Sequence, residues 1–355
     1  MSGLLKNEWS IFVVALIASV LTAVLTFTSA NAVLVFLISA VALATLATVV
    51  GQATEQLGNY LGPGATGVLQ SAIGNLPELF VSFFALQAGL VTVVQSALVG
   101  SILANSLLVL GLAFLLGGAK YGTQKFMSES PRAIVILMVL AVSALVVPTL
   151  AHTLHTPAEA HEETLSIASA IILLMVFVAS IPMALKGGPL AEASHAAGQE
   201  KTRWSLVRVL SVLAVAGVSA ALVSDWFVQA LEPAIETLHI SQAFAGLVVV
   251  AIAGNAVENV VGIQLALKNK VDYAISVIMN SSLQVALALT PILVLLSFFF
   301  APVALTLVLP PLLVVALGLA AILSALIVYD GESNWLEGLA LMGLYLMIAI
   351  SFWWG

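Results

Sequence analysis

Eleven apolar runs, each close to the length of a membrane-spanning helix, follow one another along this chain of 355 residues. A spanning helix needs roughly 20 mostly apolar residues. The runs lie near residues 9–28, 31–50, 66–88, 94–118, 131–150, 165–185, 205–223, 241–267, 273–298, 303–328 and 335–354. Only 8% of the residues are charged, against about 25% in a typical soluble domain. We therefore predict an all-α polytopic membrane protein of about eleven helices, with no strands.

The basic residues divide the loops between these helices into two sets. All ten fall on one face when the crossings are counted: Lys6, Lys120, Lys125, Arg132, Lys186, Lys201, Arg203, Arg208, Lys268 and Lys270. Loops rich in Lys and Arg stay in the cytoplasm. The split predicts a multi-pass protein of the cell inner (plasma) membrane, with a cytoplasmic N-terminus and an extracytoplasmic C-terminus.

An internal repeat with an offset of 180 residues organises the chain. Residues 74–78 read Gly-Asn-Leu-Pro-Glu and residues 254–258 read Gly-Asn-Ala-Val-Glu. The same offset pairs further residues across the next helix: Ser96 with Ser276, Ser101 with Ser281, Leu103 with Leu283 and Leu107 with Leu287. Each copy holds five helices, an odd number, so the two copies cross the membrane in opposite senses. Inverted repeats of this kind build secondary transporters, whose site lies at the repeat interface.

The repeat divides the chain into four parts. Residues 1–30 form an extra N-terminal transmembrane helix, and residues 31–185 form the first five-helix repeat. Residues 186–204 form a polar cytoplasmic linker, and residues 205–355 form the second repeat.

The repeated motifs place Glu78 and Glu258 near the middle of predicted spans. A charged carboxylate at that depth costs about 2.5–3.5 kcal/mol on insertion scales, so it usually marks a function. Asn75 and Asn255 each precede a glutamate by three residues and share its helix face, while Gly74 and Gly254 allow a partner to approach. Carboxylate and amide oxygens are the hard ligands that Ca²⁺ prefers. We predict a shared cation site at the two motifs.

Polar side chains on the helices that follow each motif extend this predicted site. They are Ser101 and Asn105 after the first motif, and Asn280, Ser281, Ser282 and Gln284 after the second. Burial and mutual repulsion of the two glutamates both favour protonation of the empty site. A divalent cation would then have to displace protons, which couples the two movements at one site.

A second group of possible metal ligands lies in a predicted outer loop. It consists of His152, His155, Glu159, His161, Glu162 and Glu163. Imidazole and carboxylate groups bind metals, but we expect this loop to be solvated and at most to gather cations.

These motifs resemble the cation/proton exchanger (calcium/proton antiporter) family of the calcium/cation antiporter superfamily. The resemblance rests on Gly-Asn-x-x-Glu in both repeats, on Gly-Ser-Ile-Leu-Ala-Asn at 100–105 and on Asn-Ser-Ser-Leu-Gln at 280–284, and it covers nearly the whole chain. It implies alternating access, in which Glu78 and Glu258 carry cation and protons. It also implies that Asn75, Asn255, Ser281 and Gln284 belong to the site.

The leading interpretation is a secondary active transporter that exchanges Ca²⁺ for H⁺, without a cofactor, an enzymatic activity or a nucleic-acid partner. Exchange of Na⁺, K⁺ or Mn²⁺ for H⁺ stays open, as does Na⁺/Ca²⁺ exchange, because Leu76-Pro77 is similar to the sodium/calcium exchanger branch. A cation channel is the alternative from a different class. An intramembrane hydrolase is disfavoured because all five His lie away from the span centres.

Overall fold

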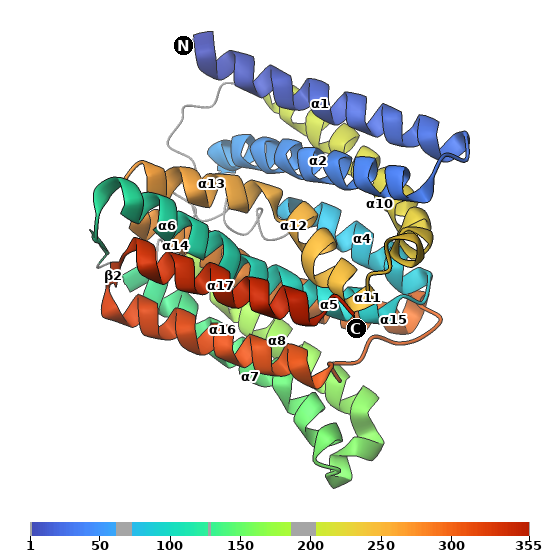
Figure 1. Ribbon diagram of the computed structural model, residues 1–355, viewed down its shortest axis with the longest axis vertical. Coiled ribbons are helices and arrows are strands. Elements are labelled where there is room, and N and C mark those ends of the chain that lie inside the picture. Colours follow the sequence, from blue (N-terminus) through green and yellow to red (C-terminus); the bar gives the residue numbers. More distant parts are fainter. Residues whose placement is uncertain (1, 62–72, 127–128, 186–203, 355) are drawn as a thin grey trace.

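The computed structural model describes residues 2–61, 73–126, 129–185 and 204–354, which form helices joined by short turns (Figure 1). The first half contains α1 (Ser2–Phe27), α2 (Ala32–Leu61), α4 (Leu76–Gln87), α5 (Val91–Leu103), η2 (Ala104–Val109), α6 (Leu110–Tyr121), β1 (Gln124–Lys125), α7 (Glu129–Thr153), η3 (Pro157–His161) and α8 (Glu162–Leu185). The second half contains α10 (Leu206–Leu238), α11 (Gln242–Phe244), η4 (Ala245–Val250), α12 (Ala251–Gly254), α13 (Ala256–Leu267), α14 (Val271–Gln284), η5 (Val285–Leu289), α15 (Thr290–Phe300), α16 (Pro311–Asp330), β2 (Glu332–Ser333) and α17 (Trp335–Ser351).

The predicted all-helical membrane class is confirmed. Within the described ranges, eight helices are long and apolar enough to cross a membrane, and a bent pair, Gln242–Gly254 with Glu258–Leu267, brings the number to nine. Two shorter apolar helices, Leu76–Gln87 and Trp335–Ser351, lie in the two remaining predicted spans. The count of eleven stays a prediction, because residues 62–72 lie outside the described residues.

Several predicted boundaries were wrong, and so was the expectation that no strand would occur. The helix predicted at 205–223 continues to Leu238, and the one predicted at 31–50 continues to Leu61. The strands β1 and β2 pair antiparallel over two residues each, which is too short to leave a sequence pattern. Lys125 Nζ lies 2.9 Å from Glu332 Oε1 beside this pairing. The hydrogen bond from Lys125 to Glu332 raises the pKa of Lys125.

The structure follows the 180-residue offset closely. The bounds of α4 shifted by 180 are those of α13, and the π-helical stretches η2 and η5 interrupt matching helices. Gly89 and Asn269 are also paired by the offset, and both have positive φ values, of 76° and 59°. Gly and Asn tolerate that conformation best. Ser282 Oγ donates to the carbonyl oxygen of Ile102 over 3.4 Å. These two residues are 180 positions apart, so the contact joins equivalent positions of the offset.

The motif-bearing helices lie in the centre of the molecule (Figure 1). The helices α1, α2 and α10 pack together on one side of them, and α16, α7 and α8 lie on the other. Two glycines allow α5 and η4 to cross closely. A Cβ on Gly100 would lie 2.6 Å from Leu247 Cα, and one on Gly246 would lie 3.0 Å from Ala97 N. This crossing holds the first-repeat helix α5 against the second-repeat motif.

Residues 301–310, predicted as the connection and start of a helix, form a non-helical segment before α16. Its backbone groups bond to side chains of surrounding helices. Its N–H groups donate as follows: Leu305 to Ser297 Oγ (2.8 Å), Leu307 to Ser166 Oγ (2.9 Å) and Leu309 to Thr149 Oγ1 (2.8 Å). Gln95 Nε2 donates to the carbonyls of Thr306 and Val308, both over 3.0 Å. These bonds allow irregular backbone to lie within the protein at membrane depth.

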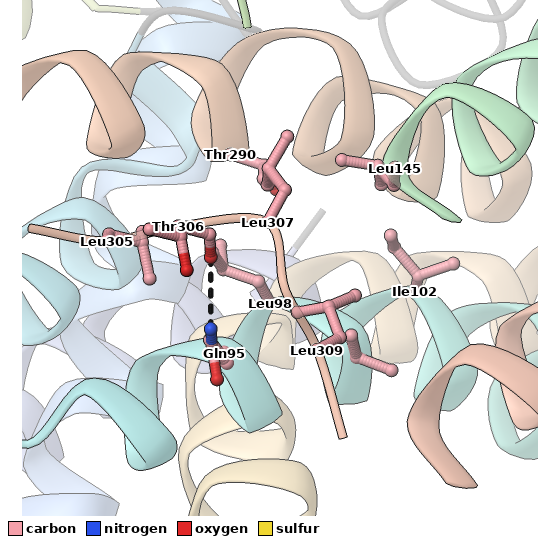
Figure 2. Close-up of a pocket in the computed structure, with 10 residues that line it drawn as sticks. Gln95, Leu98, Ile102, Leu145, Thr290, Leu305, Thr306, Leu307 and Leu309 are labelled. Atoms are coloured by element: carbon pink, nitrogen blue, oxygen red, sulfur yellow. Dashed lines mark hydrogen bonds between the residues drawn. The ribbon is translucent and has the colours of Figure 1, made fainter. Parts of the chain in front are cut away.

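Figure 2 shows Gln95 reaching Thr306 across a small cavity. The cavity measures about 10 Å³ and lies between the segment and the face of α5 that carries Leu98 and Ile102. Ser101, on the same helix, bonds to Glu78. The 301–310 segment therefore supports α5 on one side while α5 contributes to the motif site.

We expect Gln95→Leu to lower the thermal stability of the detergent-solubilised protein. The substitution leaves the carbonyls of Thr306 and Val308 without their donor, and an unpaired buried polar group costs about 1–3 kcal/mol. Gln87→Leu, the same chemical change at an exposed position of α4, is the control. Equal melting temperatures for the two variants would show that the segment does not depend on Gln95.

Candidate functional site

The Asn of each motif lies directly before a short helix. Asn75 precedes α4 with φ −90° and ψ 14°, and Asn255 precedes α13 with φ −95° and ψ 22°. Glu78 and Glu258 consequently lie in the first turns of these half-helices. At the second motif, the two helical parts differ in direction by 65°. The positive ends of the two half-helices therefore favour negative charge at both glutamates.

Glu78 is held by donors from both repeats. Its Oε1 accepts hydrogen bonds from Ser101 Oγ and from Asn255 Nδ2, the latter over 3.0 Å. Its Oε2 is buried and has no hydrogen-bond partner among the described residues. The side chain is only 2% exposed. A Cβ on Gly254 would lie 2.8 Å from Glu78 Cγ, so the motif glycine makes room for the opposite glutamate.

Asn255 connects most of the polar residues of the site. Its Nδ2 donates to Glu78 Oε1 and Ser101 Oγ, each over 3.0 Å, and to the carbonyl of Ala251 over 2.8 Å. Its Oδ1 accepts from Asn105 Nδ2 over 3.1 Å and from Ser281 Oγ over 3.2 Å. Since Asn105 also donates to Ser281 Oγ over 3.0 Å, these donors fix which end of the Asn255 amide faces Glu78.

Glu258 lies on the opposite half-helix and is 8% exposed. Its carboxyl interacts electrostatically with that of Glu78. Asn75, the first-repeat counterpart of Asn255, donates from Nδ2 to Gln284 Oε1 over 3.4 Å. The two glutamates therefore lie in one site but have different partners.

The structure thus joins Glu78, Ser101, Asn255 and Ser281 in one hydrogen-bonded network and pairs Asn75 with Gln284. Asn105, which the sequence predicts as an extension of the site four residues after Ser101, is central to this network. Asn280 lies on α14, four residues before Gln284. It is half-buried and does not join the network within the described residues. Packing between distant helices, rather than a sequence motif, distinguishes Asn105 from Asn280.

Several oxygens of the site are available to a cation. Glu78 Oε2 and Asn105 Oδ1 are both buried without a hydrogen-bond partner in the described part of the chain, and Glu258 supplies a second carboxyl. Such groups need an explanation, because buried polar atoms are normally paired. Protons on the carboxyls or a cation bound between them would each satisfy these oxygens.

Four of the outer His and Glu residues form pairs between an exposed His and a half-buried Glu. His152 Nδ1 lies 3.3 Å from Glu162 Oε2, and His155 Nδ1 lies 3.0 Å from Glu159 Oε2. Across residues 2–61, 73–126, 129–185 and 204–354, no three His, Asp or Glu residues are arranged to hold a metal ion.

Comparison with known proteins identifies relatives of this chain. The family described as sodium/calcium exchanger protein matches residues 31–186 and 208–354. A protein of Bacillus subtilis named Ca(2+)/H(+) antiporter ChaA is 36% identical over 322 residues, which cover 89% of this chain and 91% of the relative. One of Aphanothece halophytica, named Ca(2+)/H(+) antiporter, is 34% identical over 334 residues, covering 90% of this chain and 89% of the relative.

A solved structure shows the same fold over nearly the whole chain. The structure of native YfkE superimposes with a TM-score of 0.82 at 32% identity, covering 97% of this chain and 99% of the other. The chain therefore belongs to the sodium/calcium exchanger family of membrane transporters, within its cation/proton exchanger branch.

Proposed function

We propose that this protein exchanges Ca²⁺ for H⁺ across the membrane, with Glu78 and Glu258 binding either the cation or protons. The observation that carries the proposal is a pair of buried carboxyls, each in the first turn of a motif helix, one of which has an unpartnered oxygen among the described residues. Two relatives named Ca(2+)/H(+) antiporter support the choice of ions. Na⁺, K⁺ or Mn²⁺ in place of Ca²⁺, and Na⁺ in place of H⁺, are the alternatives.

The surrounding polar residues complete the proposed site. Asn75, Asn255, Ser101, Ser281 and Gln284 position the carboxyls or bind the cation, and Gly74 and Gly254 allow the two motifs to approach. Ca²⁺ commonly takes six to eight oxygen ligands. Part of this number would come from water, because two oxygens of this site, Glu78 Oε2 and Asn105 Oδ1, are buried without a partner in the described ranges.

The repeats move relative to each other as the site changes sides. We propose that residues 31–185 and 205–355 form these repeats, that residues 1–30 add a helix, and that residues 186–204 link the halves. Alternating access around a fixed site is the usual mechanism of inverted-repeat transporters. A carrier of this kind moves a fixed number of ions per cycle, whereas a channel gives discrete currents in single-channel recordings.

Transport by purified protein in liposomes tests this function. A pH-sensitive dye inside the vesicles should report proton movement when Ca²⁺ is added outside, and Na⁺, K⁺ and Mn²⁺ should each give a smaller response. If Na⁺ or K⁺ drives proton movement and Ca²⁺ does not, that ion rather than Ca²⁺ is the substrate. Ca²⁺ flux that needs Na⁺ and moves no protons would favour Na⁺/Ca²⁺ exchange.

Reporter fusions test the proposed orientation in the plasma membrane. We expect a reporter after Gly355 to lie outside the cell and one inserted within 190–200 to lie inside, because all ten Lys and Arg residues fall on one face. The two ends of the chain also lie toward opposite ends of the helix array (Figure 1). Both reporters on the same side would contradict the inverted arrangement of the repeats.

A further inference from the structure

The end of α13 that lies away from Glu258 is bound by two side chains of α6. Lys120 Nζ and Tyr121 Oη both donate to the carbonyl oxygen of Leu267, each over 2.9 Å. The last carbonyls of a helix lack partners within the helix, and a positive charge is favourable at this end. A first-repeat helix therefore binds the last turn of the second-repeat motif helix.

Gln124, in β1, binds the turn that follows α13. Its Nε2 donates to Asn269 Oδ1 over 2.8 Å and to the carbonyl of Ala266 over 3.4 Å. Asn269 has a φ of 59°, a conformation that Asn tolerates better than most residues. The same side chain thus allows the helix to end here and accepts the hydrogen bond from β1. A Cβ on Gly117 would clash with Gln124 Oε1, so this glycine of α6 makes room for the glutamine.

The strand β1 is itself held by the turn between α16 and α17. It pairs antiparallel with β2, and the N–H of Phe126 donates to the carbonyl of Gly331 over 2.9 Å. The side chains of Gln124 and Phe126 are both buried. The groups that bind the end of α13 are therefore supported from both repeats. We call Lys120, Tyr121 and Gln124 the α13 anchor.

The 180-residue offset gives α4, the other motif helix, different partners at its equivalent end. The three anchor residues and Asn269 have counterparts whose side chains form no hydrogen bonds, namely Phe300, Ala301, Ala304 and Gly89. The rings of Phe83 and Phe300 pack edge to face there, with centroids 5.8 Å apart. The anchor is therefore a feature of α13 and not of the repeat.

We propose that the α13 anchor is a set of positioning residues that hold Glu258 in place for cation binding, a role that rests on the proposed Ca²⁺/H⁺ exchange. Glu258 lies in the first turn of α13, about 13 Å from Leu267 at 1.5 Å of rise per residue. A helix of 12 residues transmits a shift of one end to the other. Binding its last turn to α6 and β1 thus fixes where the carboxyl lies, and the cation meets a ligand that is already in position.

The test is the double variant Lys120→Met with Tyr121→Phe, which keeps the size of both exposed side chains and removes both donors to Leu267. Ca²⁺ transport by the reconstituted protein gives the KM and the maximal rate. We expect the KM for Ca²⁺ to rise about 5-fold with the maximal rate within about 2-fold of wild type, since a net hydrogen bond corresponds to a factor of about 2–10. Gln124→Leu should raise the KM in the same direction.

Lys120→Arg combined with Tyr121→Phe is the rescue variant. Arginine also donates hydrogen bonds, so the KM should return to within about 2-fold of wild type, because one charged donor to Leu267 is kept. Lys125→Met is the matched control. Its Nζ lies 2.9 Å from Glu332 and belongs to β1 without contributing to the anchor, so the KM should not change.

A lower melting temperature with an unchanged KM would show that the anchor only stabilises the fold, and the inference would fail. A higher maximal rate with an unchanged KM would show that these contacts must break during transport, which would also overturn it. A rescue variant with the same KM as Lys120→Met with Tyr121→Phe would exclude the hydrogen bond as the cause. If wild type moves no protons in exchange for Ca²⁺, the proposed function fails instead, so the two failures are distinguishable.

Discussion

Exchange should be lost in both Glu78→Gln and Glu258→Gln, while the protein should still fold. Each substitution leaves one negative charge to bind a divalent cation and removes one carboxyl that carries a proton. We expect Ca²⁺-driven proton movement to fall by roughly 100-fold or more, because even losing a partner of a metal ligand costs about 10–100-fold. The double variant should be no worse than either single one, since each single loss already stops the cycle.

Folding should survive because glutamine resembles the protonated acid in shape. In Glu78→Gln, the new amide oxygen would still accept from Ser101 and Asn255, as Glu78 Oε1 does. The change also removes the cost of burying a charge. Elution as a single species and a melting temperature equal to or above that of wild type would confirm folding. Near-normal exchange by well-folded Glu258→Gln would remove that residue from the transport mechanism.

Asn255→Ala should damage both the stability and the activity of the protein. The substitution removes the acceptor of Ser281 and one of the two side-chain acceptors of Asn105, together with a donor to Glu78. Buried groups left unpaired cost about 1–3 kcal/mol each, so we expect a loss of about 2–4 kcal/mol, offset in part by water. Transport should fall about 10–100-fold, as for other residues that orient metal ligands.

Thermal unfolding in detergent and Ca²⁺ transport in liposomes measure the two effects separately. Asn259→Ala, a change at a half-buried amide one turn further along α13, is the matched control and should have the smaller effect on transport. Equal transport by Asn255→Ala and wild type would show that the network does not set the geometry of Glu78. Loss of transport in Asn259→Ala but not in Asn255→Ala would show that transport requires the Asn259 amide instead.

Much of the architecture could be predicted from the sequence because the decisive signals are local. Runs of about 20 apolar residues predict spanning helices wherever they occur. The repeated Gly-Asn-x-x-Glu motif singled out both glutamates, and in the structure its offset of 180 also relates the bounds of α4 to those of α13. The expectation that Asn75 and Asn255 share a continuous helix face with the glutamates was too simple. Each Asn lies instead at the break before its half-helix.

The features that escaped prediction depend on contacts between distant parts of the chain. Residues 301–310 are apolar enough to read as helix, yet they are held in another conformation by Gln95, Thr149, Ser166 and Ser297 from four helices. Likewise, the pairing of Asn75 with Gln284 joins residues 209 positions apart. No periodicity in the sequence reports such partners, so the different partners of the two glutamates became visible only in three dimensions.

Proton release on cation binding is the most direct measurement of the shared site. Ca²⁺ is added to purified protein in weakly buffered detergent solution, and the protons released are counted with a pH indicator at several starting pH values. If Ca²⁺ displaces protons from Glu78 and Glu258, release should accompany binding, and apparent Ca²⁺ affinity should strengthen as pH rises until both carboxyls are ionised. Glu258→Gln should release fewer protons. Ca²⁺ binding that releases no protons and has the same affinity at every pH would contradict competition at these glutamates.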